Sequence, residues 1–178
     1  MTKAERRVID KVLVIIGVVL VAAFLIAGGL TWKAYRFADD SVRSELSQQK
    51  IYFPPKGSPA LDPTEFPDLQ KYAGQLVDNG PKAKAYANGF IGRHLEKTAG
   101  GKTYSEVSSE ALKDPTNQQL QQQKQTLFQG ETLRGLLLGD GYAYWEFGHI
   151  AYAASIASFI GAAVMTVLVV LGLARVRR

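Results

Sequence analysis

The chain has 178 residues, 47% of them hydrophobic, and its 21 Lys+Arg against 16 Asp+Glu give a formal net charge of +5. By length and pI alone, a single soluble domain that binds nucleic acid would fit. The positions of the charges exclude nucleic acid as a partner, because residues 33–149 carry 14 basic and 14 acidic side chains and the whole excess lies in the two tails. The absence of cysteine excludes disulfide bonds, iron–sulfur clusters and metal sites built from thiolates.

Two long segments without a charged residue predict two transmembrane helices. Residues 12–32 and residues 150–174 form uncharged runs of 21 and 25 residues, and a helix needs about 20 apolar residues to cross the hydrocarbon core of a bilayer. We expect the first segment to be an anchor and not a cleaved signal peptide, because its apolar core exceeds the usual length of about 7–15 residues.

Basic residues flank these segments on the side of the two tails, as they do on the cytoplasmic side of membrane proteins. The sequence therefore predicts a protein of the cell (plasma) membrane with both termini cytoplasmic and residues 33–149 extracytoplasmic. The second segment gives the stronger evidence, since no Lys or Arg occurs between Arg134 and Arg175. The residues that set this topology are Lys3, Arg6, Arg7, Lys11, Arg175, Arg177 and Arg178.

In chain order, we expect a cytoplasmic basic tail, a transmembrane helix, a stalk helix, a proline-rich strap, an extracytoplasmic helical domain, a second transmembrane helix and a second basic tail. These segments are residues 1–11, 12–32, 33–50, 51–67, 68–149, 150–174 and 175–178. The stalk is predicted to stay helical to about Gln49, because residues 33–49 contain no Gly or Pro.

The strap contains five prolines, which remove backbone donors and favour extended or turn-rich structure. Two alternatives remain open for it. It is either a disordered linker or an ordered segment lying on another surface, and its Tyr52, Phe53, Leu61 and Phe66 favour order, because a flexible spacer has little use for aromatic side chains.

Helical patterns fill the rest of the outer domain. A short helix is predicted over residues 68–77, ended by Asn79-Gly80, and a longer one from Pro81 to Ala99, stopped by Gly100-Gly101.

A capping-box pattern, Thr103 to Glu106, predicts the start of a helix that runs through Leu112. A further helix is predicted from Asp114-Pro115 to Leu138, followed by a break or hinge at Gly139-Asp140-Gly141. The predicted fold is therefore an all-α membrane protein: two transmembrane helices with a small helical extracytoplasmic domain inserted between them.

The chemistry-bearing residues form no catalytic, cofactor-binding or metal-binding set. Gly101-Lys102-Thr103 resembles the end of a P-loop, but Glu96 stands where the motif needs its first glycine. Neither His94 nor His149 has a second ligand at a suitable spacing. We therefore expect no cofactor, a structural hydrogen bond for His94 and a place at the membrane interface for His149.

The second transmembrane segment has a broad face of small residues, which lets another helix approach closely. Packing between the two spans explains part of this face, and an additional helix partner is expected to cover the rest. The predicted interface consists of Ala153, Ala154, Ala157, Ser158, Gly161 and Ala162. The predicted anchors at the membrane interface are Trp32, Tyr35, Tyr144, Trp145, His149 and Tyr152.

Several of these residues carry a resemblance to a known family. Tyr86-Ala87, Ile91, His94, the run from Gly100 to Tyr104 and the run from Leu133 to Leu138 before a Gly/Ala-rich span resemble a group of actinobacterial two-span membrane proteins. The group is often mislabelled as aromatic ring-opening dioxygenases, although the sequence offers no ligand set for an iron site. By size and architecture the chain is also similar to small accessory subunits of the actinobacterial respiratory supercomplex.

Three functions follow as hypotheses. The first is a non-catalytic accessory subunit of a larger integral membrane complex, in contact with lipids. The resemblance implies that this complex is the supercomplex of cytochrome bcc and cytochrome aa-type oxidase. The second is a stand-alone envelope protein whose outer domain binds a lipid, a ligand or a secreted partner. The third, an enzyme, would need a site that the sequence does not offer.

Overall fold

The computed structural model describes residues 2–177, and its chain divides into two compact units. The first unit consists of Met1–Phe37 and Phe147–Arg178, and the second is Ala38–Glu146. All elements are helical, and the described residues contain no β-strand, only an isolated antiparallel bridge between Tyr52 and Leu76. The predicted all-α class is confirmed, and two helices are long and apolar enough to cross a membrane.

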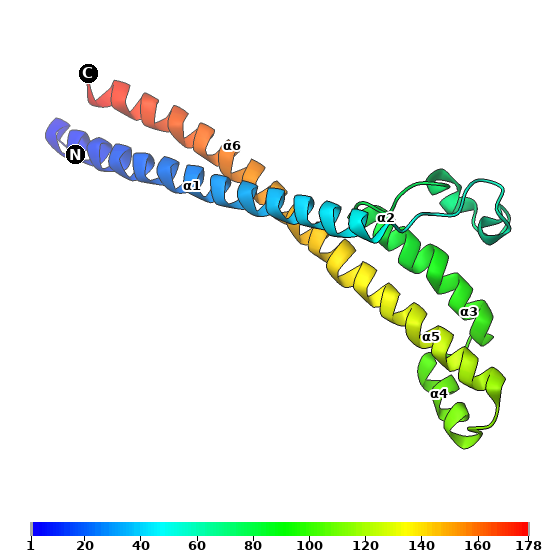
Figure 1. Cartoon of the computed structure of the whole chain (residues 1–178). Coiled ribbons are helices and arrows are strands. Elements are labelled where there is room, and N and C mark those ends of the chain that lie inside the picture. The colour runs from blue at the N-terminus through cyan, green and yellow to red at the C-terminus, as the bar shows by residue number, and fades with distance from the viewer. Residues whose placement is uncertain (1, 178) are drawn as a thin grey trace. The chain divides into compact units, whose positions relative to one another are not determined.

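The first helix continues beyond its apolar segment, as predicted. Helix α1 runs without a break over Lys3–Gln49 (Figure 1). It ends at Lys50, whose φ of 52° lies in the left-handed region that terminates helices. The helix therefore contributes residues 3–37 to the first unit and residues 38–49 to the second.

The predicted break at Gly139-Asp140-Gly141 is wrong. Helix α5 (Gln118–Leu136) passes through a π-helical segment, η4 (Leu137–Ala143), directly into α6 (Tyr144–Val176) (Figure 1). The glycine at 141 serves packing, because a Cβ there would lie 3.0 Å from the Cβ of Ala83. The wider π-helical turn keeps the backbone hydrogen-bonded, so the glycines do not interrupt the helix.

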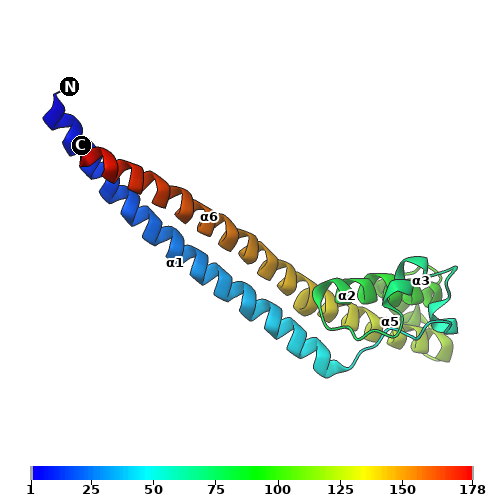
Figure 2. The ribbon, with the colours of Figure 1, turned by 90° about the horizontal axis from the view of Figure 1, so that it is seen from above.

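Within the first unit, α1 and α6 pack as an antiparallel pair whose described ends lie together (Figure 2). The shielded residues recur at alternating spacings of three and four, the period of a coiled coil. On α1 they are Asp10, Val14, Gly17, Val21, Phe24, Gly28, Thr31 and Tyr35. On α6 they are Ala151, Ser155, Ser158, Ala162, Met165, Val169, Gly172 and Val176, with the shielded Gly161 beside Ala162. We call these two rows the seam.

Along the seam, glycines on each helix face large side chains on the other. A Cβ added at Gly17 would lie 2.6 Å from Val169, and one added at Gly28 would lie 2.9 Å from Phe159.

The reverse arrangement also occurs. A Cβ added at Gly161 would lie 3.2 Å from Phe24, and one added at Gly172 would lie 2.8 Å from Val14. Alternating large and small partners let the backbones approach closely.

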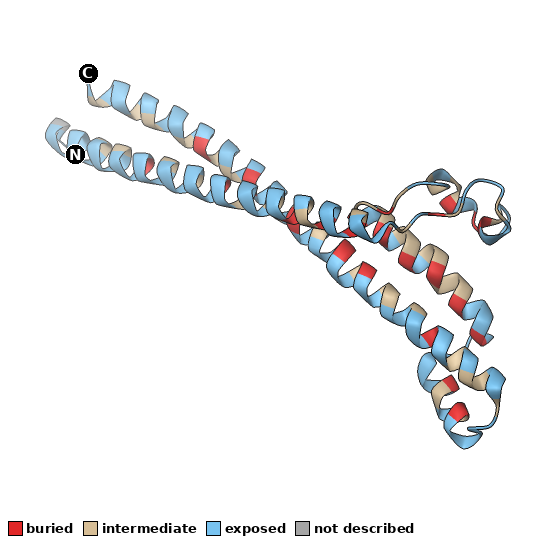
Figure 3. Ribbon diagram, viewed as in Figure 1, coloured by how far each residue is buried: buried red, intermediate tan, exposed pale blue. Residues whose placement is uncertain are grey.

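Away from the seam, most residues of both long helices are exposed (Figure 3), and many of them are large and apolar. In the most apolar stretch of each, only 11% and 6% of the residues are buried. The buried side chains lie mainly in the second unit.

The strap is an ordered part of the second unit, so the structure favours the second of the two alternatives. Phe53, Leu61 and Phe66 are at most 1% exposed. Two 3-10 helices, η1 (Pro59–Leu61) and η2 (Pro67–Tyr72), shape the segment. Phe53, Leu61 and Phe66 of the strap therefore belong to the hydrophobic core.

The predicted helix over residues 68–77 is largely wrong, because the helical part ends at Tyr72. Gly74 takes a φ of 72°, and the chain then runs back along the strap. The Phe53 N–H donates to the Gln75 carbonyl at 2.9 Å, and the Val77 N–H donates to the Ile51 carbonyl at 2.8 Å. These bonds replace the helical ones that the sequence pattern suggested.

The next helix begins as predicted, although Asn79 caps it and does not end the previous one. Helix α2 (Gly80–Lys84) continues through the π-helical η3 (Ala85–Gly92) into α3 (Arg93–Ala99), and Gly100 ends it at a φ of 59°. The π-helical turn was not predicted from the sequence.

Two N-caps define the last helices of the unit. Helix α4 (Tyr104–Lys113) begins with the predicted capping box of Thr103 and Glu106. Helix α5 begins at Gln118 and not at Asp114, because the side chain of Asn117 accepts the Leu120 N–H at 3.1 Å.

Candidate functional site

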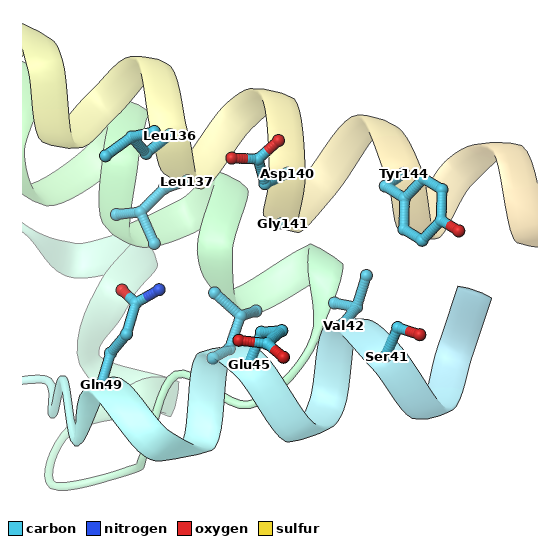
Figure 4. Close-up of a pocket in the computed structure, with 10 residues that line it drawn as sticks. Ser41, Val42, Glu45, Gln49, Leu136, Leu137, Asp140, Gly141 and Tyr144 are labelled. Atoms are coloured by element: carbon cyan, nitrogen blue, oxygen red, sulfur yellow. The ribbon is translucent and has the colours of Figure 1, made fainter. Parts of the chain in front are cut away.

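A groove in the second unit is the candidate functional site. It has a volume of about 320 Å³ and lies between the last turns of α1 and the helix formed by α5, η4 and α6 (Figure 4). Its lining consists of Ser41, Val42, Glu45, Leu46, Gln49, Leu136, Leu137, Asp140, Gly141 and Tyr144.

Apolar residues form the floor of the groove. Val42, Leu46 and Leu137 are 1–4% exposed, so their positions are fixed by the core. Gly141 lies in the wall of the groove, where a Cβ on it would meet Leu46 at an ordinary contact distance of 3.5 Å, and its tight neighbour is Ala83 of α2. The π-helical turn η4 sets which side chains reach this wall, and such turns are frequent at functional sites.

Two carboxylates stand on opposite walls of the groove, Glu45 on α1 and Asp140 on η4 (Figure 4). No Lys or Arg is among the lining residues. Within the part of the chain that the structure describes, neither carboxylate forms an ion pair. The groove therefore combines an apolar floor with unpaired negative charge at its rim.

The structure gives His94 the structural role predicted for it. Its Nδ1 lies 2.8 Å from the Phe90 carbonyl oxygen, and its ring stacks on Phe66 at 5.2 Å between centroids. No group of three or more His, Cys, Asp or Glu side chains able to hold a metal ion occurs among residues 2–177.

The residues that resemble a P-loop lie where α3 ends and α4 begins. Lys102 donates to the Glu110 carboxylate at 2.7 and 2.8 Å. The Glu106 carboxylate accepts the backbone N–H of Thr103 at 2.7 Å and also its hydroxyl, and these bonds lower the pKa of Glu106. These contacts account for Lys102 and Thr103 without a phosphate.

An ion pair connects η2, which follows the strap, to α3. The Arg93 guanidinium donates two bonds to the Asp68 carboxylate, at 2.8 and 2.9 Å. These bonds hold the pKa of Asp68 below its ordinary value of 3.8. Asp68 is 53% exposed, so the pair orients the two segments and adds little stability.

Four of the predicted interface anchors form one aromatic cluster in the first unit. The ring of Tyr35 lies 4.9 Å from Tyr152, 5.4 Å from His149 and 5.7 Å from Trp32. Trp32 and Tyr152 also meet, at 5.9 Å. The four side chains of the cluster lie at the same height along the helix pair and connect α1 to α6.

The other two predicted anchors belong to the second unit. Trp145 packs against its core and lies so close to Gly80 that a Cβ there would be 2.5 Å from the indole ring. Tyr144 is 38% exposed and lines the groove. Sequence position alone could not separate these two residues from the cluster in the first unit.

The seam divides the predicted small-residue face of α6. Ser158, Gly161 and Ala162 are shielded by α1, whereas Ala153, Ala154 and Ala157 are exposed. The exposed alanines are therefore available to another helix.

The basic residues predicted to set the topology lie near the chain ends of the helix pair. Arg6, Arg7, Lys11, Arg175 and Arg177 are exposed there. Arg178 and the side chain of Lys3 lie outside what the structure describes.

No pattern in the sequence indicates that the residues of the groove lie close together in the fold. Asp140 was predicted to lie in a hinge, and no local pattern places it opposite Glu45 of α1. The chain matches no protein-family model, and no curated protein or solved structure shows a significant similarity to it.

Proposed function

We propose that the chain is a two-span membrane protein with both termini in the cytoplasm and its second unit outside the cell. The exposed apolar surfaces of α1 and α6 support insertion into lipid, because a core helix of a soluble protein would be mostly buried. The exposed basic residues at one end of the helix pair support a cytoplasmic position for that end.

Single cysteines test this topology, since the chain has none of its own. In intact cells, a membrane-impermeant maleimide is expected to label Lys113→Cys and to leave Thr2→Cys unlabelled until the cells are permeabilised. Both positions are exposed. Labelling of Thr2→Cys in intact cells would contradict the proposed orientation.

Within the membrane, we propose that the protein is a non-catalytic accessory subunit of a larger integral membrane complex. The carrying observation is the exposed part of the small-residue face, Ala153, Ala154 and Ala157, which α1 leaves uncovered. Small residues favour association of helices in lipid because their backbones can approach closely. The sequence resemblance suggests the respiratory supercomplex of cytochrome bcc and cytochrome aa-type oxidase as this complex.

A pair of matched variants tests the proposal. Ala157→Leu should reduce the cytochromes that co-purify with the tagged full chain in mild detergent by about tenfold, because an overpacked helix contact costs about 1–3 kcal/mol. Ala163→Leu is the control, since Ala163 is also exposed but points about 120° away on the helix. Recovery of free monomer alone, or equal losses for both variants, would reject the proposed role.

The groove favours a second candidate function, a stand-alone envelope protein whose outer unit binds a ligand. An apolar groove with a few polar groups is the usual form of a small-molecule site. This function does not need a partner helix at Ala157, so the two candidates make different predictions for the Ala157→Leu variant.

A further inference from the structure

We propose that the groove between α1 and η4 binds an amphipathic organic cation. The ammonium group would lie at the rim, with Glu45 and Asp140, and the apolar body would lie on Val42, Leu46 and Leu137. This site goes beyond the role of an accessory subunit and does not depend on it.

The charge of the groove selects a cation. Its two carboxylates have no basic residue beside them in the lining and no ion-pair partner in the described chain. Other carboxylates of the same unit are paired, such as Glu110 with Lys102 and Glu131 with Arg134. An anionic ligand would be repelled here, and a cation would be attracted.

The shape of the groove selects an organic ion over a metal ion. About 320 Å³ is enough for a small organic molecule, since ligand pockets have volumes of about 300–1,000 Å³. The floor is made of side chains that cannot coordinate a metal, and the two carboxylates belong to no larger cluster of metal-binding side chains within residues 2–177.

Tyr144 adds a recognition element at the end of the groove. Tyr144 is 38% exposed and lines the groove one helical turn beyond Asp140 (Figure 4). The face of an aromatic ring attracts an ammonium group. The site therefore has a charged rim, an aromatic end wall and an apolar floor, which together match an amine attached to an apolar body.

A pair of probes that differ in charge tests the site in the full chain, reconstituted in phosphatidylcholine nanodiscs. The probes are 4-butylbenzylamine, protonated at pH 7, and the neutral 4-butylbenzyl alcohol. Binding is followed through the methyl NMR signals of Leu46 and Leu137, with Leu69, a buried leucine outside the groove, as the internal reference. The amine is expected to bind about tenfold more tightly than the alcohol, from two exposed charge pairs and one ring contact.

The Glu45→Gln/Asp140→Asn double variant should abolish this preference while the alcohol still binds. Glu146→Gln is the control, because Glu146 is an exposed carboxylate of the same unit that does not line the groove. Equal binding of the two probes to the wild-type chain would overturn the proposal. So would a preference for the amine that survives in the double variant, or shifts at Leu69 as large as those at Leu46.

Discussion

Replacing Phe53 with alanine is expected to lower the free energy of unfolding of the second unit by about 3–5 kcal/mol, the usual range for truncating a buried phenylalanine. Phe53 is 1% exposed, and its ring stacks on Tyr72 at 5.2 Å and meets the edge of Tyr86 at 5.0 Å. The variant leaves a cavity where the strap joins the helices. Since a domain has a stability of only about 5–15 kcal/mol, the strap is expected to detach.

The neighbouring residue provides the control. Tyr52 has a similar ring but is 55% exposed, so Tyr52→Ala should change the stability by less than about 0.5 kcal/mol. Both variants are compared with the wild-type chain by urea unfolding in mild detergent, followed by near-ultraviolet circular dichroism. Equal destabilisation by the two variants would show that the strap does not contribute to the core through Phe53.

Adding one methyl group at Gly80 is expected to destabilise the second unit by about 2–3 kcal/mol through overpacking. The new Cβ would lie 2.5–2.7 Å from the Cβ and ring atoms of Trp145. These atoms lie near the base of a rigid side chain, so relief requires a movement of the whole indole or of the helix. The near-ultraviolet signal of Trp145 should change together with the unfolding midpoint.

Gly135 provides the matched control for Gly80. It lies inside α5, and a Cβ there would meet no atom within 4 Å. Gly135→Ala should therefore stabilise the chain by about 0.5–1 kcal/mol, because alanine favours the helix. A destabilised Gly135→Ala variant, or an unchanged Gly80→Ala variant, would contradict the packing described for these helices.

The features that the sequence predicted well depend on local chemistry. The capping box at Thr103 and Glu106 is complete within four residues, and Gly100 ends a helix in the left-handed conformation. Charge-free stretches are equally local, so the two long apolar helices were evident from the sequence.

The prediction failed where a residue's role depends on distant partners. A Gly-Asp-Gly run is typical of a hinge, and only the close approach of Gly141 to Ala83 shows why glycine occurs inside a continuous helix. The end of η2 at Tyr72 likewise depends on pairing with the strap, some twenty residues earlier along the chain.

The sequence contains a signal for the seam, but a search for small residues that repeat every four positions does not find it. In a fully apolar segment, periodic hydrophobicity carries no information about which face is covered. Gly17 and Gly28 are separated by eleven residues, as are Gly161 and Gly172, and eleven residues are about three helical turns. This spacing marks one face on each helix, and that face is the seam.

The alternation of glycines with large residues fixes how α1 and α6 can move. If α1 slid along α6 by seven residues, about 10 Å, movement in one direction would bring Phe24 opposite Val169 and Phe159 opposite Tyr35. These pairs of large side chains would overpack the seam.

In the other direction the slide would bring Gly28 opposite Ala151 and Gly17 opposite Ala162, which leaves voids. Piston-like displacement of one helix along the other is therefore opposed in both directions. A conformational signal that crosses this pair would have to travel as a rotation or a splaying of the helices.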